Sequence, residues 1–230
     1  MSSSNDALDF STILASSAHD MKNSLAILLT SLSEITDQCN SETCTSRDLL
    51  LRARQEGERV NRDLVHLLTL YRIEQSNYFA NLSEITLSDF LDEVLIKHKI
   101  MLASHQINIR VENSTENPGY FDEELVSEII NTVIGNAHRY TKDQILVQTG
   151  YENGYLVLSI KDNGPGYPDT LLQSETQRQE GVNFGTGSTG LGLYFAARVA
   201  ALHKNKGKHG YIRISNDGIN NGGCFSMYLP

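Results

Sequence analysis

The stretch QILVQTGYENGYLVLSIKDNGPG, residues 144–166, decides the fold of this chain. Two runs rich in apolar and β-branched residues, 144–150 and 155–162, flank the tetrapeptide YENG. An Asn-Gly pair between two such runs is the strongest short-range signal for a β-hairpin. The second run leads directly into DNGPG (162–166), whose glycines permit a tight turn. We therefore expect a hairpin whose second strand ends in a glycine-rich turn.

Around this hairpin, helical and strand patterns are mixed. Helical periodicity covers three segments: 87–105, 122–141 and about 192–204. Ser88 is the expected N-cap of the first segment. Further strands are expected at INIRVE (107–112), YIRISN (211–216) and CFSMYLP (224–230). Hairpins without regular β-α-β alternation favour the α+β class, here a two-layer α/β sandwich over residues 81–230.

The first 80 residues show a different pattern, two heptad seams. Apolar residues recur at alternating steps of three and four in both; the seams are Leu14, Ala18, Met21, Leu25, Leu28, Leu32 and Ile35, and Leu50, Ala53, Gly57, Val60, Leu64, Leu67 and Tyr71. The polar stretch between them predicts a helical hairpin with helices over 8–37 and 46–75. Because two helices alone cannot bury both faces, we expect a homodimer that forms a four-helix bundle.

Composition excludes some classes of function. A formal net charge of −9 argues against nonspecific nucleic-acid binding, which needs a basic face. No apolar run is long enough to span a membrane, and the N-terminus lacks a signal-peptide pattern. The three cysteines, Cys39, Cys44 and Cys224, lack zinc-type spacing, and reduced thiols indicate a cytoplasmic protein.

A polar cluster, SSAHDMKNSL (16–25), interrupts the first heptad helix. His19, Asp20 and Asn23 fall at outward heptad positions and, at spacings of three and four, share one helix face. The cluster alone fits a solvated face better than an active site. A neutral imidazole beside a carboxylate can also act as a nucleophile with its base. The active-site interpretation requires a phosphoryl donor elsewhere in the chain.

Two glycine-rich stretches predict that donor. DNGPG follows a strand, and GTGSTGLGL (185–193) opens a helix, whose N-terminus offers unpaired amides and a positive dipole end to phosphates. NAHRY precedes both on a predicted helix, where Asn136 offers an oxygen suited to Mg²⁺ and Arg139 a cation for phosphate. Together these features predict a nucleotide site.

In these motifs the chain resembles the sensor histidine kinases of two-component systems, with a HisKA-type hairpin and a GHKL-type ATPase domain. SSAHDMKNSL looks like the H-box, NTVIGNAHRYT (131–141) the N-box, and DNGPG and GSTGLGL (187–193) the two glycine boxes. The resemblance covers nearly the whole chain and implies residues 1–80 as the dimerisation and phosphotransfer hairpin and 81–230 as the ATP-binding domain of Bergerat type, with a lid at about 168–187.

The resemblance also implies a role for each matching residue. His19 takes the γ-phosphoryl group of ATP, Asp20 acts as base or orienter, and Asn23 places water for the reverse, phosphatase direction. Asn136 binds Mg²⁺, and Asp162 accepts a hydrogen bond from the adenine amine while Gly164 and Gly166 keep the pocket open. The other nucleotide contacts are Arg139, Tyr140, Thr189, Gly190, Leu191 and Gly192.

Three positions depart from the family's pattern. Ser24 stands where many members have proline, and Arg139 replaces the commoner lysine. Thr132 stands where the first N-box asparagine usually lies, with Asn131 one place away, so the family's amide for one Mg²⁺ or phosphate contact is absent at that position.

We therefore expect an ATP-dependent protein-histidine kinase that phosphorylates itself on His19 and passes the phosphate to an aspartate of a response regulator. A scaffold that does not turn over ATP and a phosphatase-biased enzyme remain the alternatives. The sequence does not name the input signal or the cognate regulator. It also leaves open whether the reaction runs in cis or in trans, the kinase-to-phosphatase balance, and whether the chain is a soluble kinase or the cytoplasmic portion of a longer sensor.

Overall fold

In the computed structural model the chain forms two compact units, Met1–Asn77 and Tyr78–Pro230. The structure describes residues 10–38, 47–75, 78–115, 117–172 and 190–230. Within these ranges, side chains are described for all residues except 10–20, 37–38, 47–48, 97 and 190. None of the described helices is long and apolar enough to cross a membrane.

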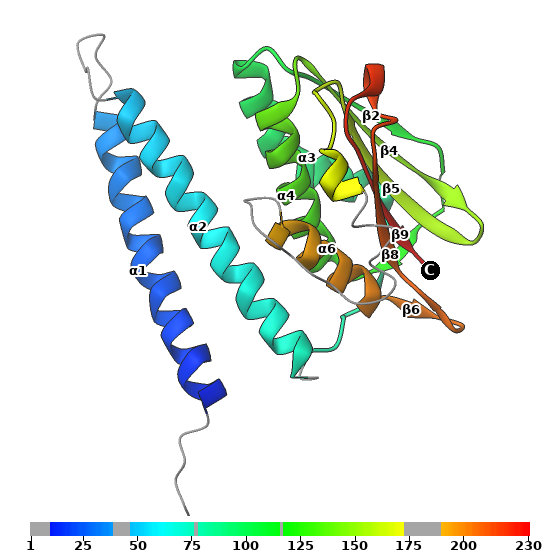
Figure 1. The fold of residues 1–230 in the computed structure, drawn as a ribbon, viewed down its shortest axis with the longest axis horizontal. Helices are drawn as coiled ribbons and strands as arrows, with labels where there is room; N and C mark the ends of the chain where they lie inside the picture. Colours follow the sequence, from blue (N-terminus) through cyan, green and yellow to red (C-terminus); the bar gives the residue numbers. More distant parts are fainter. Residues whose placement is uncertain (1–9, 39–46, 76–77, 116, 173–189) are drawn as a thin grey trace, which may run out of the picture. The chain divides into compact units, whose positions relative to one another are not determined.

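The first unit is a helical hairpin of α1 (Phe10–Gln38) and α2 (Arg47–Glu74), as the heptad pattern predicts (Figure 1). The two helices approach closely at Gly57, where a β-carbon would lie 2.7 Å from Cδ2 of Leu29. The small residue in the second seam therefore allows the helices to pack at this point.

The second unit contains a five-stranded sheet in the order β2-β4-β5-β9-β8. Its strands are β2 (Asn108–Asn113), β4 (Gln144–Glu152), β5 (Tyr155–Asp162), β8 (Tyr211–Ser215) and β9 (Cys224–Leu229). β4 and β5 form the predicted hairpin, and its turn residues Asn153 and Gly154 have φ of 52° and 77°, as a type I′ turn requires. β2 pairs with β4 in parallel, a pairing that the sequence pattern did not predict.

Three helices cover one face of this sheet: α3 (Leu87–Ser104), α4 (Glu123–Tyr140) and α6 (Gly190–Leu202) (Figure 1). Alternate residues are buried at 145–149 in β4 and at 156–160 in β5, including Val147 and Leu158, and these side chains form the core with buried α4 residues such as Ile129. Helices on one face of a mixed sheet confirm the α+β prediction.

Shorter elements complete the unit. Two small antiparallel strand pairs, which the sequence did not predict, are β1 (Ser83–Ile85) with β3 (Gly119–Phe121) and β6 (Lys204–Asn205) with β7 (Lys208–His209). A 3₁₀ turn, η2 (Ile219–Asn221), precedes β9. Ser88 does not cap α3 as expected. Ser88 lies inside the helix, and its hydroxyl donates to Asp89. The N-cap is Thr86, which makes no side-chain cap hydrogen bond.

Candidate nucleotide site

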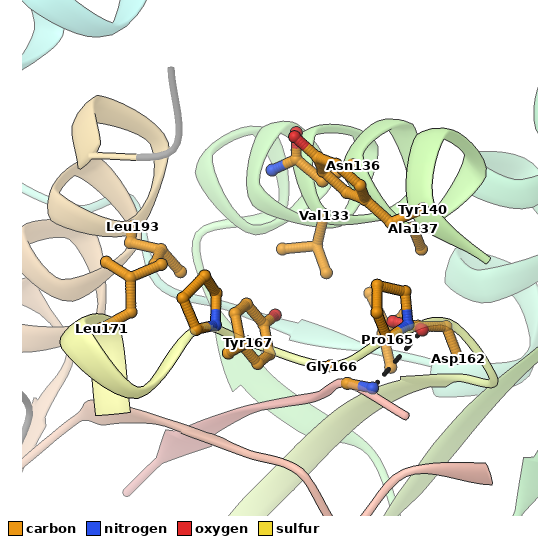
Figure 2. A pocket seen from close by; sticks show the side chains of 13 residues that line it. Val133, Asn136, Ala137, Tyr140, Asp162, Pro165, Gly166, Tyr167, Leu171 and Leu193 are labelled. Carbon is orange, nitrogen blue, oxygen red and sulfur yellow. Dashed lines mark hydrogen bonds between the residues drawn. The ribbon is translucent and has the colours of Figure 1, made fainter. Parts of the chain in front are cut away.

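A cavity of about 230 Å³ lies between α4 and the turn that follows β5 (Figure 2). Its walls are mostly apolar, with a few polar groups among them, which is typical of small-molecule sites. Its lining comes from α4, from β5 with the following turn, from α6 and from the loop before β9: Val133, Asn136, Ala137, Tyr140, Ile160, Asp162, Pro165, Gly166, Tyr167, Pro168, Leu171, Leu193 and Gly223.

Asp162 is the acidic residue of this lining, at the end of β5. Its Oδ1 accepts hydrogen bonds from the amides of Gly164 at 2.7 Å and Gly223 at 3.4 Å. Burial raises the pKa of this half-buried carboxyl, and the two amides act in the opposite direction. Among the described contacts both donors end at Oδ1, so Oδ2 is available to accept a hydrogen bond from a ligand.

Asn163, the second residue of DNGPG, holds the connection between α4 and β4 in place. Its Oδ1 accepts from the hydroxyl of Thr141 at 2.8 Å and from three successive amides, those of residues 142–144, at 3.1–3.2 Å. Its Nδ2 donates to Oδ1 of Asp143 at 2.7 Å. The buried carboxamide thus fixes the turn that carries Asp162 against the end of α4.

Gly164 does not line the cavity. A β-carbon there would lie 2.4 Å from the backbone oxygen of Tyr140, so this glycine lets the turn approach the last turn of α4. Its role is close packing, and not the open pocket expected of it.

Gly166 lines the cavity and has φ of +78°, a conformation that favours glycine. The carboxamide of Asn216 holds the next residue, accepting from Tyr167 N at 2.6 Å and donating to its carbonyl oxygen at 3.0 Å. A β-carbon at Gly166 would lie 2.5 Å from Oδ1 of Asn216.

The N-box residues divide between the cavity and the surface. Asn136 and Tyr140 lie one helical turn apart, and Figure 2 shows both on the α4 side of the cavity, across from Asp162. Arg139 is exposed and is not part of the lining. The sequence pattern grouped these three residues, but only two of them face the cavity.

The positions around the missing N-box asparagine also separate. Oδ1 of Asn131 lies 2.8 Å from Nε2 of His98, so Asn131 faces α3 and does not replace the missing amide. Thr132 is buried, and its Cγ2 lies 3.2 Å from where a β-carbon of Gly192 would be. The smaller threonine therefore lies beside the first turn of α6.

The second glycine box is described in part. Thr189 and most of the expected lid lie outside the described residues. Gly190 begins α6, Leu191 is half-buried, and Leu193, which was not predicted as a site residue, lines the cavity.

The H-box residues belong to the first unit, and the cavity belongs wholly to the second. His19 and Asp20 lie in α1 by their backbone, but their side chains lie outside the described residues. Asn23 is exposed on α1, as its outward heptad position predicts.

Sequence reasoning missed several residues of the site: Tyr167, Leu171, Leu193, Asn216 and Gly223. A signal for the last two was present, because NDGINNGG (216–223), dense in turn formers, joins two predicted strands.

Comparisons with known proteins agree with this geometry. Residues 121–230 match the family of histidine kinase-, DNA gyrase B- and HSP90-like ATPases. The match covers 110 of the 230 residues, just under half of the chain. The chain is 24% identical over 223 residues to the sensor protein SrrB of Staphylococcus aureus, an alignment that covers 94% of this chain and 37% of SrrB. The chain thus spans little more than a third of the length of the curated relatives it matches.

Solved structures show the same fold. The Acinetobacter baumannii histidine kinase AdeS is 20% identical with a TM-score of 0.60, covering 92% of this chain and 96% of that one. Full-length ShkA in complex with AMPPNP is 20% identical with a TM-score of 0.67, covering 94% and 45%. These likenesses show that the chain shares the fold of these histidine kinases.

Proposed function

We propose that this chain is an ATP-dependent protein-histidine kinase that phosphorylates His19 and passes the phosphoryl group to an aspartate of a response regulator. The observation that carries the proposal is the cavity with Asp162 at its base. A mostly apolar cavity with a carboxylate in its lining fits adenine, whose exocyclic amine would donate to Oδ2 while the ring packs against apolar lining residues such as Ile160 and Leu193.

The phosphates of ATP would extend toward Gly192 and the amides that open α6, together with Thr189, Gly190 and Leu191. Asn136 fits a magnesium contact, because its side chain faces the cavity and a carboxamide oxygen is a hard ligand. No cluster of three or more His, Cys, Asp or Glu that could hold a metal occurs among the described residues. Asn136 would therefore hold Mg²⁺ with the phosphates and water, and the ion would neutralise charge on the phosphates.

In the transfer itself, a nitrogen of His19 attacks the γ-phosphorus. An N–P bond forms, the bond from phosphorus to the β,γ-bridging oxygen breaks, and ADP leaves. Asp20 accepts the imidazole proton. The phosphoryl group then moves from His19 to a carboxylate oxygen on the receiver domain of the regulator. Asn23, one helical turn from His19, would position water for hydrolysis of that acyl phosphate.

Exposed apolar residues on the hairpin support a homodimer. Met21, Leu28 and Ile35 recur every seven residues on α1 and are 60%, 50% and 48% exposed in the single chain. Val60 and Leu67 repeat the pattern on α2, at 51% and 48%. Full burial of such a side chain contributes about 1.5–3 kcal/mol, and covering these half-exposed ones contributes about half of that each, so a second copy that covers them would stabilise a four-helix bundle.

The functional division we propose is residues 1–80 for dimerisation and phosphotransfer and 81–230 for ATP binding, with a hinge near 76–82. We place the reaction in the cytoplasm, where response regulators and ATP meet, and expect no nucleic-acid partner for this acidic chain.

The first test is labelling with γ-phosphate-labelled ATP and Mg²⁺. Wild type should acquire an acid-labile, base-stable label, and His19→Gln should lose it while His209→Gln, a change at an exposed histidine, keeps it. Equal labelling of His19→Gln would contradict the assignment of the acceptor.

The second test is equilibrium binding of ATP. Asp162→Asn should weaken binding, whereas Asp169→Asn, a change at a neighbouring exposed carboxylate outside the lining, should not. Absence of Mg²⁺-dependent ATP binding by wild type, with indifference to Asn136→Ala, would favour the scaffold alternative.

Two further measurements test the remaining proposals. Leu28→Glu should convert the dimer to a monomer in analytical ultracentrifugation, while Ser31→Glu, at an exposed position outside the seam, should leave it dimeric. Asn23→Ala should slow dephosphorylation of a phosphorylated regulator, and an unchanged rate would remove Asn23 from that reaction.

A further inference from the structure

Asp122 is a buried carboxylate at a point where three elements meet. It is 5% exposed and caps α4, with Oδ1 accepting from the amide of Leu125 at 3.0 Å. Its Oδ2 accepts from the amide of Asn81 at 2.8 Å. Its own amide donates to Nε2 of His203 at 3.0 Å. One residue thus bonds the start of α4, the segment that enters this unit, and the end of α6.

His203 is held equally firmly at 1% exposure, directly after α6. Because the amide of Asp122 donates to Nε2, that nitrogen carries no proton, and Nδ1–H donates to the carbonyl oxygen of Val199 at 2.9 Å. Burial lowers the pKa of this imidazole, in keeping with a neutral ring. Both ring nitrogens are therefore engaged inside the protein.

The two helices that this contact joins are also walls of the nucleotide cavity. α4 contributes Asn136, and α6 contributes Leu193. The helices meet a second time near the cavity, where Thr132 lies beside Gly192. At about 1.5 Å per residue, Asn136 lies some 21 Å along α4 from Asp122, and Leu193 some 15 Å along α6 from His203. The buried contact and the approach of Thr132 to Gly192 therefore together set the relative orientation of the two helices at the cavity.

The bond from Asn81 adds the connecting segment to this arrangement. Asn81 lies two residues before the start of β1, and β1 pairs with β3, which ends immediately before Asp122. Along the chain, the connection from the hairpin is thus fixed to the start of α4 before it enters the rest of the unit.

We propose that Asp122 and His203 are positioning residues that form a joint aligning the two helical walls of the nucleotide cavity. We further propose, resting on the proposed kinase function, that the bond to Asn81 transmits constraint from the connecting segment to this joint. Neither residue touches the nucleotide. A misplacement of about 1 Å far from the chemistry can cost about a hundredfold in rate, so such a joint is a sensitive control point.

The joint is tested in the full chain with a matched pair at one position. His203→Gln keeps an acceptor near the place of Nε2, and His203→Asn keeps only a donor near the place of Nδ1. We expect His203→Asn to weaken binding of a fluorescent ATP analogue by about 5- to 20-fold, and His203→Gln to stay within about threefold of wild type. Equal affinities in all three proteins, or equal losses in both variants, would overturn the joint.

If the His203→Asn variant does not fold, hydrogen exchange in the wild-type protein tests the joint instead. Because coupling is reciprocal, nucleotide binding must slow hydrogen exchange at the Asp122 amide. An unchanged exchange rate at that amide, in a protein shown to bind the nucleotide, overturns the joint.

The transmission is tested with Asp122→Ser, which keeps an N-cap oxygen for Leu125 but loses the acceptor for Asn81. We expect unchanged nucleotide affinity with an autophosphorylation rate lowered about tenfold, whereas Glu123→Gln, a change at an exposed residue of the same turn, alters neither. Losses in both quantities, or in neither, would overturn transmission. Absence of labelling in wild type would contradict the kinase proposal. The His203 comparison would still test the joint, because it measures nucleotide affinity and not phosphoryl transfer.

Discussion

The substitution Asn163→Asp isolates the hydrogen-bond network under the cavity floor. A carboxylate at 163 still accepts from Thr141 and from the amides of residues 142–144, but it cannot donate to Asp143, whose Oδ1 lies 2.7 Å from the present donor. The variant therefore loses one hydrogen bond and sets two carboxylates against each other.

The magnitude follows from those two changes. The lost bond costs about 1 kcal/mol. Two like charges about 4 Å apart repel by about 4 kcal/mol at an effective dielectric constant of about 20, and the exposure of Asp143 to solvent reduces this. We expect a net loss of about 2–4 kcal/mol, or about 5–15 °C in melting temperature for a unit of this size.

The assay is thermal unfolding of four proteins: wild type, Asn163→Asp, Asp143→Asn and the double variant. In the double variant the amide at 143 donates to the carboxylate at 163, so most of the stability should return. The repulsion raises the carboxyl pKa in the folded variant above its unfolded value, so the deficit is full at pH 7 and shrinks as the pH falls toward 4. A double variant no more stable than Asn163→Asp would refute this account of the network.

Three further predictions follow from the site. Gly164→Ala should destabilise the protein by about 2–3 kcal/mol, because its β-carbon would lie 2.4 Å from the backbone oxygen of Tyr140. Gly135→Ala, within α4 and with open space around the β-carbon, should stabilise the protein by about 0.5–1 kcal/mol, and denaturant titration compares the two variants. Asp162→Asn should raise the melting temperature at pH 7.5, since burial raises the pKa of this carboxyl and its ionised form is disfavoured in the fold; the gain should vanish near pH 4, and calorimetry should find ATP affinity about 10- to 100-fold lower. Burial lowers the pKa of His138, with His105 as the next cause, so the unfolded chain binds more protons and stability should fall as the pH drops below about 6.5; melting curves from pH 8 to 5 should be flatter for His138→Leu.

The elements that the sequence predicted well are those specified by local patterns. The Asn153–Gly154 turn, the acidic first turn of α4 and the heptad helices each depend on neighbouring residues, and each was found within about two residues of its expected bounds. The parallel pairing of β2 with β4 was missed because β3 and α4 lie between them in sequence. The pairs β1–β3 and β6–β7 are too short to produce a periodic signal.

The site divides in the same way. Asp162 and Asn136 were predicted from motifs and line the cavity. Arg139 shares their motif but is exposed and does not line the cavity, which the one-dimensional motif could not reveal. Asn163 looked like an ordinary turn residue, since its role depends on amides about 20 positions earlier in the chain that only the folded sheet brings near.

The position of β9 has a consequence for biosynthesis. All six of its residues are buried, and it lies between β5 and β8 although it follows both in the chain. Until it emerges from the ribosome, β5 lacks its neighbour and Asp162 lacks the amide of Gly223. A nascent chain that lacks β9 therefore has an incomplete sheet beside an incomplete cavity lining, and ATP can stabilise the unit fully only after β9 has paired.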